Sequence, residues 1–284
     1  MPIERRLAAC VSRDVRQSFV DTRYVHIFSW HIYISDLMQA TLSGWRLDGE
    51  SRRARTRRKT VVSLFDANGL SLLPWHQSGF DCVGFRPSHC PHTCSGLRIH
   101  TRRMDTVDRI KALLPPVDQI EYVIAAPPCR DLAFAGARWW ESKRKRDPTF
   151  QEREVEFIKQ LFCFLTQLNV PFVMFTPATT LLQKVLRPIM IVQPFEFGGH
   201  LLNVPHPLFK LIPPRDGYTK RAILVCGGKA KRPAKHPVSP VFSTVRMRSG
   251  VKKKVSPVMA NRNSPVRAVL PLGLCTALRI AHLS

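Results

Sequence analysis

Apolar and polar positions alternate along the chain from residue 60 onward in a pattern that predicts strands separated by helices. Short apolar runs bounded by turn residues are typical of buried strands, whereas apolar positions three and four residues apart are typical of helices. Four runs predict strands, at 61–65, 80–85, 120–126 and 170–175, and further apolar segments lie near 189–195 and 221–226. This alternation predicts an α/β domain built around a mostly parallel sheet.

The clearest predicted helix follows Thr149. Thr149 and Glu152 have the spacing of a capping box, in which each side chain bonds a backbone N–H at the helix start. Asn169 and Pro171 end the helix, and shorter helices are predicted over 70–78 and 266–281. The apolar face of the long helix consists of Val155, Ile158, Leu161, Phe162, Leu165 and Leu168.

Composition divides the chain into four segments. Residues 1–59 form a basic N-terminal extension that ends in SRRARTRRK, either a nuclear-localisation or nucleic-acid arm or a charged linker. Residues 60–226 carry the α/β pattern. Residues 227–257 are rich in Lys, Arg, Pro and Gly and contain no acid, which is typical of an exposed insertion or linker. Residues 258–284 supply a C-terminal helix that completes the domain.

Charge changes this picture most. The formal net charge of +24 favours a polyanionic partner, with nucleic acid ahead of an anionic membrane surface. An apolar content of 44% is that of a globular protein, and no apolar run reaches the roughly 18–20 residues that span a bilayer. The eight scattered cysteines fit free thiols in a reducing compartment. We therefore expect an intracellular protein that binds no membrane; nothing in the sequence indicates its oligomeric state.

A thiol follows the third predicted strand. Pro127 and Pro128 stop that strand and put Cys129 at the carboxyl edge of the sheet, where open α/β folds bind their ligands. Nearby cations, for which Arg130 and Arg138 are candidates, would lower the pKa of a nucleophilic thiol. The residues alone leave two interpretations open, a nucleophile and a partly buried structural cysteine.

Four segments resemble motifs of the DNA cytosine-5 methyltransferases, especially the branch found in phages and large DNA viruses. They occur in the family's order and cover roughly residues 61–281. The segments are Ser63-Leu64-Phe65-Asp66 with Gly69, Ala126-Pro127-Pro128-Cys129 continuing through Gly136-Ala137-Arg138-Trp139, Tyr218-Thr219-Lys220-Arg221, and Arg267 with Pro271, Gly273 and Ala277.

This resemblance implies a Rossmann-like, S-adenosylmethionine-dependent methyltransferase fold, with a basic N-terminal extension and a basic insertion. It implies that the Cys129 thiolate adds to carbon 6 of a cytosine that has been turned out of the duplex. Carbon 5 would then take the methyl group of S-adenosylmethionine. Implied catalytic residues are Cys129, Arg138, Lys220 and Arg221, and implied cofactor-binding residues are Phe65, Asp66, Gly69, Asp105 and Pro127. DNA is the expected substrate, RNA is the alternative, and a viral source with a nuclear or host-cell location is implied.

Two positions depart from the family pattern. Arg86 stands where the family has an acid that binds the cofactor ribose, and a cation cannot accept those hydrogen bonds. Phe175 stands where the family has a glutamate that holds and protonates the cytosine ring, and losing a general acid typically costs on the order of 10²–10⁴ in rate. The alternative function is therefore a catalytically inactive descendant that binds nucleic acid.

Two further clusters have competing interpretations. The segment 89–94, HCPHTC, contains four residues of the types that bind zinc, but no second pair follows at zinc-finger spacing, so we expect a surface loop and no metal. Trp139 and Trp140 precede a basic run, 143–146, which is either a nucleic-acid contact or a solvated loop beside a packed ring. We expect Trp139 in the core and the lysines in solvent.

Overall fold

A computed structural model describes residues 59–129, 131–178, 180–186, 190–246, 250–260 and 265–284. The basic N-terminal extension, apart from its last residue, and the candidate cation Arg130 lie outside these residues. The described residues belong to one compact unit of the chain, Thr56–Ser284.

Seven strands form one sheet in the order β3-β2-β1-β4-β5-β7-β6, in which β7 alone runs antiparallel to its neighbours. This is the doubly wound order 3-2-1-4-5-6 with an antiparallel strand inserted beside β5, and it defines a Rossmann-like methyltransferase fold. The strands are β1 (Thr60–Leu64), β2 (Asp81–Arg86), β3 (Arg98–Thr101), β4 (Ile120–Ala125), β5 (Phe172–Pro177), β6 (Met190–Val192) and β7 (Ala222–Gly227).

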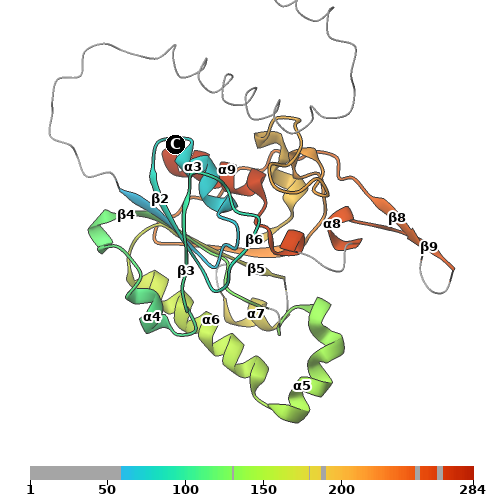
Figure 1. The fold of residues 1–284 in the computed structure, drawn as a ribbon, viewed down its shortest axis with the longest axis horizontal. Coiled ribbons are helices and arrows are strands. Elements are labelled where there is room, and N and C mark those ends of the chain that lie inside the picture. The colour runs from blue at the N-terminus through green and yellow to red at the C-terminus, as the bar shows by residue number, and fades with distance from the viewer. Residues whose placement is uncertain (1–58, 130, 179, 187–189, 247–249, 261–264) are drawn as a thin grey trace, which may run out of the picture. The chain divides into compact units, whose positions relative to one another are not determined.

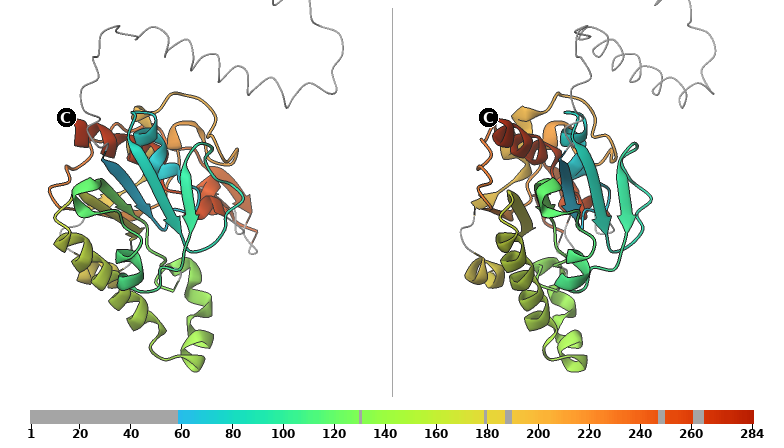
Figure 2. Two further views of the ribbon diagram at one scale, coloured as in Figure 1. Left: turned by 60° about the vertical axis from the view of Figure 1, so that its left-hand side comes forward. Right: turned by 90° about the vertical axis from the view of Figure 1, so that its left-hand side faces the viewer.

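Helices cover both faces of the sheet (Figures 1 and 2). On one face, α4 (Val107–Lys111), α6 (Phe150–Gln167) and α7 (Thr180–Val185) pack on a core that includes Val62, Val123 and Met174. On the other, α3 (Leu73–His76), the 3-10 helix η4 (Pro194–His200) and α9 (Leu272–Leu283) pack on Val61, Tyr122 and Val173. Successive strand residues alternate between the two cores because side chains alternate across a strand.

The remaining elements are short. They are η1 (Leu70–Leu72), η2 (Val117–Gln119), η3 (Phe134–Trp139), α5 (Trp140–Arg146), η5 (Pro214–Asp216), β8 (Ser243–Arg246), β9 (Lys252–Val255), α8 (Pro257–Ala260) and η6 (Pro265–Ala268). α5 and the hairpin of β8 and β9 project from the body of the domain in Figure 1. The hairpin lies within 227–257, the segment that composition alone describes as an insertion or linker.

Three local predictions were wrong. The Thr149 side chain makes no cap bond at the start of α6 but accepts a bond from Arg153, so the predicted capping box is absent. The predicted helix at 70–78 is a 3-10 turn followed by the four residues of α3, and the helix predicted from 266 begins at Leu272, after Pro271.

The C-terminal segment also corrects the expectation about apolar length. Among the described residues, Val266–Leu283 is long and apolar enough to cross a membrane by length and composition, although no such run was expected. The segment is 56% buried and is interrupted between η6 and α9. Leu274, Cys275 and Leu278 of α9 lie in the core on the sheet, which is the packing of a domain helix.

Candidate functional site

The turn after β1 contains the first group of predicted cofactor residues. Phe65 has a φ of 66° and Gly69 a φ of 75°, a left-handed conformation that is uncommon for a residue such as phenylalanine. The Phe65 ring is buried against Phe157 of α6 at a centroid distance of 6.0 Å. Phe65 therefore holds the turn against the helix layer, and its ring serves the core.

Asp66 is committed to the turn itself. Its Oδ2 atom accepts bonds from the backbone N–H of Ser71 at 2.9 Å and from the Ser71 hydroxyl at 2.6 Å. Its Oδ1 atom accepts the Asn68 N–H at 3.2 Å. Asp66 is 3% exposed, so these internal donors occupy the carboxylate that the resemblance assigns to the cofactor.

Arg86 at the end of β2 crosses the same turn. Its Nη1 atom donates to the carbonyl oxygens of Ala67 at 2.8 Å and Cys90 at 3.2 Å, and to the Thr93 hydroxyl at 2.8 Å. Its Nε atom donates to the Thr101 hydroxyl at 3.4 Å. The side chain is 6% exposed, so the position where the resemblance implies a ribose-binding acid holds a buried cation bonded to the protein's own oxygens.

Side chains from β3 and the loop before it cover Gly69. A Cβ atom at Gly69 would lie 2.7 Å from Cδ1 of Ile99 and 3.3 Å from Cδ1 of Leu97. The Cys94 N–H donates to the Asn68 carbonyl at 2.9 Å and joins this loop to the turn. The buried side-chain amide of Asn68 has no hydrogen-bond partner among the described residues. Taken together, the residues here do not fit S-adenosylmethionine.

Cys129 lies at the carboxyl end of β4, as predicted. The Cys129 side chain is half-buried. The backbone carbonyl of Cys129 accepts hydrogen bonds from the N–H groups of Leu132 and Ala133, so Cys129 is the first residue of a tight turn. Burial raises the pKa of the Cys129 thiol to about 12; the nearby Glu154 carboxylate acts in the same direction and the Lys220 ammonium opposes it. A nucleophilic role requires a base or a substrate group that removes this proton.

Lys220 is the cation that lowers the pKa of the Cys129 thiol. Its Nζ atom donates to the Arg267 carbonyl at 2.6 Å and lies 5.8 Å from the centroid of the Phe175 ring. Burial lowers the pKa of Lys220 to about 8; the Cys129 side chain opposes this shift and Arg267 adds to it. The structure thus brings Cys129, Lys220 and Phe175 to one end of the sheet.

The loop after Cys129 is tied to α6 and α5. The Asp131 N–H donates to Glu154 at 3.1 Å, and the Gln151 side chain donates to the Asp131 carbonyl at 2.9 Å. Lys143 of α5 forms an ion pair with the Asp131 carboxylate. The resemblance assigned none of these anchors a role, although Asp131 lies within its catalytic-loop motif.

Other predicted catalytic residues lie in solvent. Arg138 is exposed, and its guanidinium stacks 4.9 Å from the ring of Trp139. Trp139 is 55% exposed, which corrects the expectation that it lies in the core. Arg144 to Arg146 are exposed as expected, whereas Lys143 is half-buried by its ion pair. Arg221 is also exposed, beside the half-buried Lys220.

The two remaining cofactor predictions differ in burial. Pro127 is buried where β4 ends, which fits a residue that aims the following thiol. Asp105 is exposed and forms ion pairs with Arg109 at 2.5 Å and Arg103 at 2.8 Å. The Asp105 carboxylate, just before α4, is thus paired with two arginines of the protein itself.

The segment 89–94 does not gather its four candidate zinc ligands. His89 and His92 are exposed, whereas Cys90 and Cys94 are buried. Burial raises the pKa of the Cys94 thiol to about 12, with a further contribution from Asp66, so this thiol stays protonated. Within the described ranges, no group of three or more His, Cys, Asp or Glu residues could hold a metal ion.

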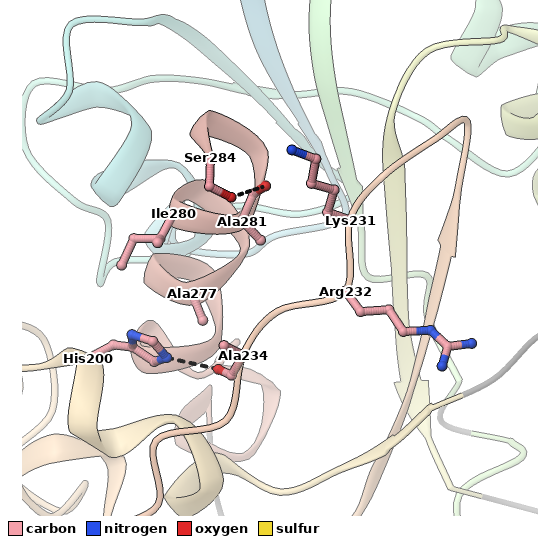
Figure 3. A pocket seen from close by; sticks show the side chains of 8 residues that line it. All are labelled: His200, Lys231, Arg232, Ala234, Ala277, Ile280, Ala281 and Ser284. Carbon is pink, nitrogen blue, oxygen red and sulfur yellow. Dashed lines mark hydrogen bonds between the residues drawn. The ribbon is translucent and has the colours of Figure 1, made fainter.

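Two cavities lie elsewhere in the domain. One, of about 170 Å³, separates Ala277, Ile280 and Ala281 of α9 from the 231–234 segment, and Figure 3 shows Arg232 directed away from the helix. The other is a groove of about 450 Å³ between α4 and α6. Neither is lined by Gly69 or Cys129.

The strand order places the chain among Rossmann-like methyltransferase folds. No protein-family model and no curated protein matches it. Among solved structures it is similar to WbdD bound to a kinase inhibitor, with 10% identity over 76% of this chain and 44% of that chain and a TM-score of 0.34. A second WbdD structure gives 11% identity, 78% and 45% coverage and a TM-score of 0.33. The chain thus spans less than half the length of these WbdD structures. TM-scores of 0.34 and 0.33 give no basis for assigning their activity to this chain.

Proposed function

We propose that this chain is a DNA-binding protein built on the methyltransferase fold, with the cofactor half of the site closed by its own residues. The observation that carries the proposal is the buried guanidinium of Arg86, which bonds four protein oxygens at the position of a ribose-binding acid. The net charge of +24 supports a polyanionic partner. Phe175, at the position of the catalytic glutamate, supports binding without methylation.

Two titrations test this proposal on the full chain. Calorimetry with S-adenosylmethionine should give no binding heat, because Asp66 and Arg86 already bond protein groups. Fluorescence anisotropy with duplex DNA should show an affinity that falls steeply with salt, because neutralised phosphates release counterions. Saturable cofactor binding, or DNA binding that barely changes with salt, would contradict the proposal.

A second candidate function is methylation of cytosine in DNA, with Cys129 as the nucleophile and S-adenosylmethionine as the methyl donor. It is favoured by the half-buried Cys129 at the end of β4 and by the neighbouring Lys220 ammonium. It requires Ile99 and Leu97 to move away from Gly69. In this second candidate function, RNA is the alternative substrate to DNA.

A trapping experiment separates the two functions. DNA containing 5-fluorocytosine is incubated with the protein and S-adenosylmethionine, and a covalent adduct is sought by mass spectrometry. The DNA-binding proposal expects no adduct. An adduct that maps to Cys129 and disappears in Cys129→Ala, together with transfer of a tritiated methyl group, would establish the second function. The same assay with RNA tests the alternative substrate.

A further inference from the structure

The hairpin of β8 and β9 presents one strongly cationic face. In its antiparallel register Thr244 lies opposite Lys254 and Arg246 opposite Lys252. Residues directly opposite one another share a face of such a pair. All four of these side chains are exposed, whereas on the other face Ser243, Val245 and Val255 are half-buried and Lys253 is exposed. The outer face therefore carries three cations and one hydroxyl.

Within the described part of the chain, these charges have no acidic partners. No described carboxylate lies within ion-pair distance of Arg246, Lys252, Lys253 or Lys254, and the whole segment 227–257 contains no acid. By contrast, Lys143 and Lys145 of α5 pair with Asp131 and Glu141. Like charges directly opposite one another destabilise a strand pair. Arg246 and Lys252 therefore repel one another in the free protein, and a bound polyanion would relieve this repulsion.

Shape narrows the choice of polyanion. Each strand has four residues and extends about 13 Å, and two paired strands lie about 5 Å apart before their side chains are added. The major groove of B-form DNA, about 12 Å wide, admits a two-stranded ribbon of this kind, whereas the major groove of A-form RNA is too narrow. The hairpin also projects from the body of the domain (Figure 1).

We propose that the β8–β9 hairpin enters the major groove of duplex DNA, with Arg246, Lys252 and Lys254 directed at phosphates and at guanine edges. This inference rests on the proposed function and adds the element, the groove and the form of nucleic acid. Arginine and lysine are the side chains best suited to the N7 and O6 acceptors of guanine, and Thr244 supplies a further donor beside them.

The test compares two triple variants of the full chain. One carries Arg246→Ser, Lys252→Ser and Lys254→Ser on the hairpin. The matched control carries Arg109→Ser, Lys111→Ser and Lys159→Ser, which remove the same charge from exposed residues of α4 and α6 that are already ion-paired. Because all six positions are on the surface, we expect both variants to fold. Far-ultraviolet circular dichroism and urea unfolding verify this.

Duplex DNA binding is measured from low to high salt, with footprinting of guanine N7 by dimethyl sulfate as a report on the major groove. We expect the hairpin variant to lower the slope of log affinity against log salt by about 2–3 and to lose the N7 protection, while the control keeps both. A hairpin variant with the slope and protection of the wild type overturns this inference alone. Duplex RNA bound as tightly as DNA overturns it too. Failure of the wild-type chain to bind any duplex overturns the proposed function.

Discussion

Two halves of the same sheet edge are built in opposite ways. At the β1–β2 half, Asp66 and Arg86 bond groups of the protein itself, and Ile99 covers the glycine turn. At the β4–β7 half, Cys129 and Lys220 remain half-buried, and Lys220 donates to a single carbonyl. Polar groups that bond one another internally are no longer available to a ligand, whereas a thiol and an amine with few hydrogen-bond partners are still available to one. This edge of the sheet therefore has a closed half, at β1 and β2, and an accessible half, at β4 and β7.

The largest expected effect concerns the reactivity of the thiol in the accessible half. A pKa of about 12, against an ordinary value of 9.0, should make Cys129 react with iodoacetamide about a thousandfold more slowly than an ordinary thiol at neutral pH. Its rate should rise roughly tenfold per pH unit up to at least pH 10. Peptide mass spectrometry follows the reaction, with the exposed Cys163 as the internal reference. A rate at Cys129 that reaches a plateau below pH 9 would show that a cation has activated the thiol.

Arg86 provides the corresponding test of the closed half. Arg86→Met nearly keeps the volume but leaves the Ala67 carbonyl oxygen without its side-chain donor and the Cys90 carbonyl with the Thr93 hydroxyl alone. Because unsatisfied buried acceptors are costly, we expect the free energy of unfolding to fall by about 3 kcal/mol in urea titrations. Arg102→Met is the control, since the exposed Arg102 side chain bonds, among the described residues, only the Thr101 carbonyl next to it. Equal stability of the two variants would mean that Arg86 does not hold this half closed.

Asp216 lies in the segment that leads to Lys220, and its burial makes the stability of the fold dependent on pH. Burial raises the pKa of Asp216 to about 7, and the N–H groups of Gly273 and Leu272 oppose the shift. A raised pKa means that the folded chain holds the proton more tightly than the unfolded chain does. The stabilisation is therefore complete below about pH 4 and is lost as the pH rises through 7.

Asp216→Asn removes this titration while keeping an oxygen for the Gly273 N–H. The variant and the wild type should be similarly stable at pH 4, and the variant should be more stable by on the order of 2 kcal/mol at pH 8. Urea unfolding across this pH range measures the difference. A constant difference between the two proteins at every pH would exclude Asp216 as its source.

The sequence predicts the closed half and the accessible half unequally well, for physical reasons. The central strands were predictable because fully buried strands are continuous apolar runs bounded by turns. β3 was missed because an exposed edge strand of four residues, in which Ile99 alone is partly buried, carries no clear alternation of apolar and polar positions. Cys129 was placed correctly because two prolines mark the end of β4. The sequence shows that Arg86 replaces the acid of the family pattern. Its hydrogen bonds to Ala67, Cys90 and Thr93 depend on loop geometry that no local sequence pattern encodes.

Contacts between distant segments were the least predictable. Lys220 meets Phe175 only because β7 pairs antiparallel with β5, with Pro177 opposite Ala222. Trp139 was expected in the core because large aromatic rings usually are buried, yet it follows a loop that ends in solvent and stacks with Arg138. The Thr149 capping box failed because Arg153 competes for the same hydroxyl.

Lys220 gives the smallest expected effect and the finest test of the accessible half. Its ammonium lowers the pKa of Cys129 against the larger effects of burial and Glu154, so Lys220→Met should slow alkylation of Cys129 further, by roughly fivefold at pH 8. Lys220→Arg keeps a cation at this position and should restore most of the rate. Unfolding of both variants in urea separates this electrostatic effect from a change in packing against Phe175. If methionine and arginine slowed the reaction equally, the thiol and the cation would not be coupled, and the accessible half would contain two independent residues in place of a pair.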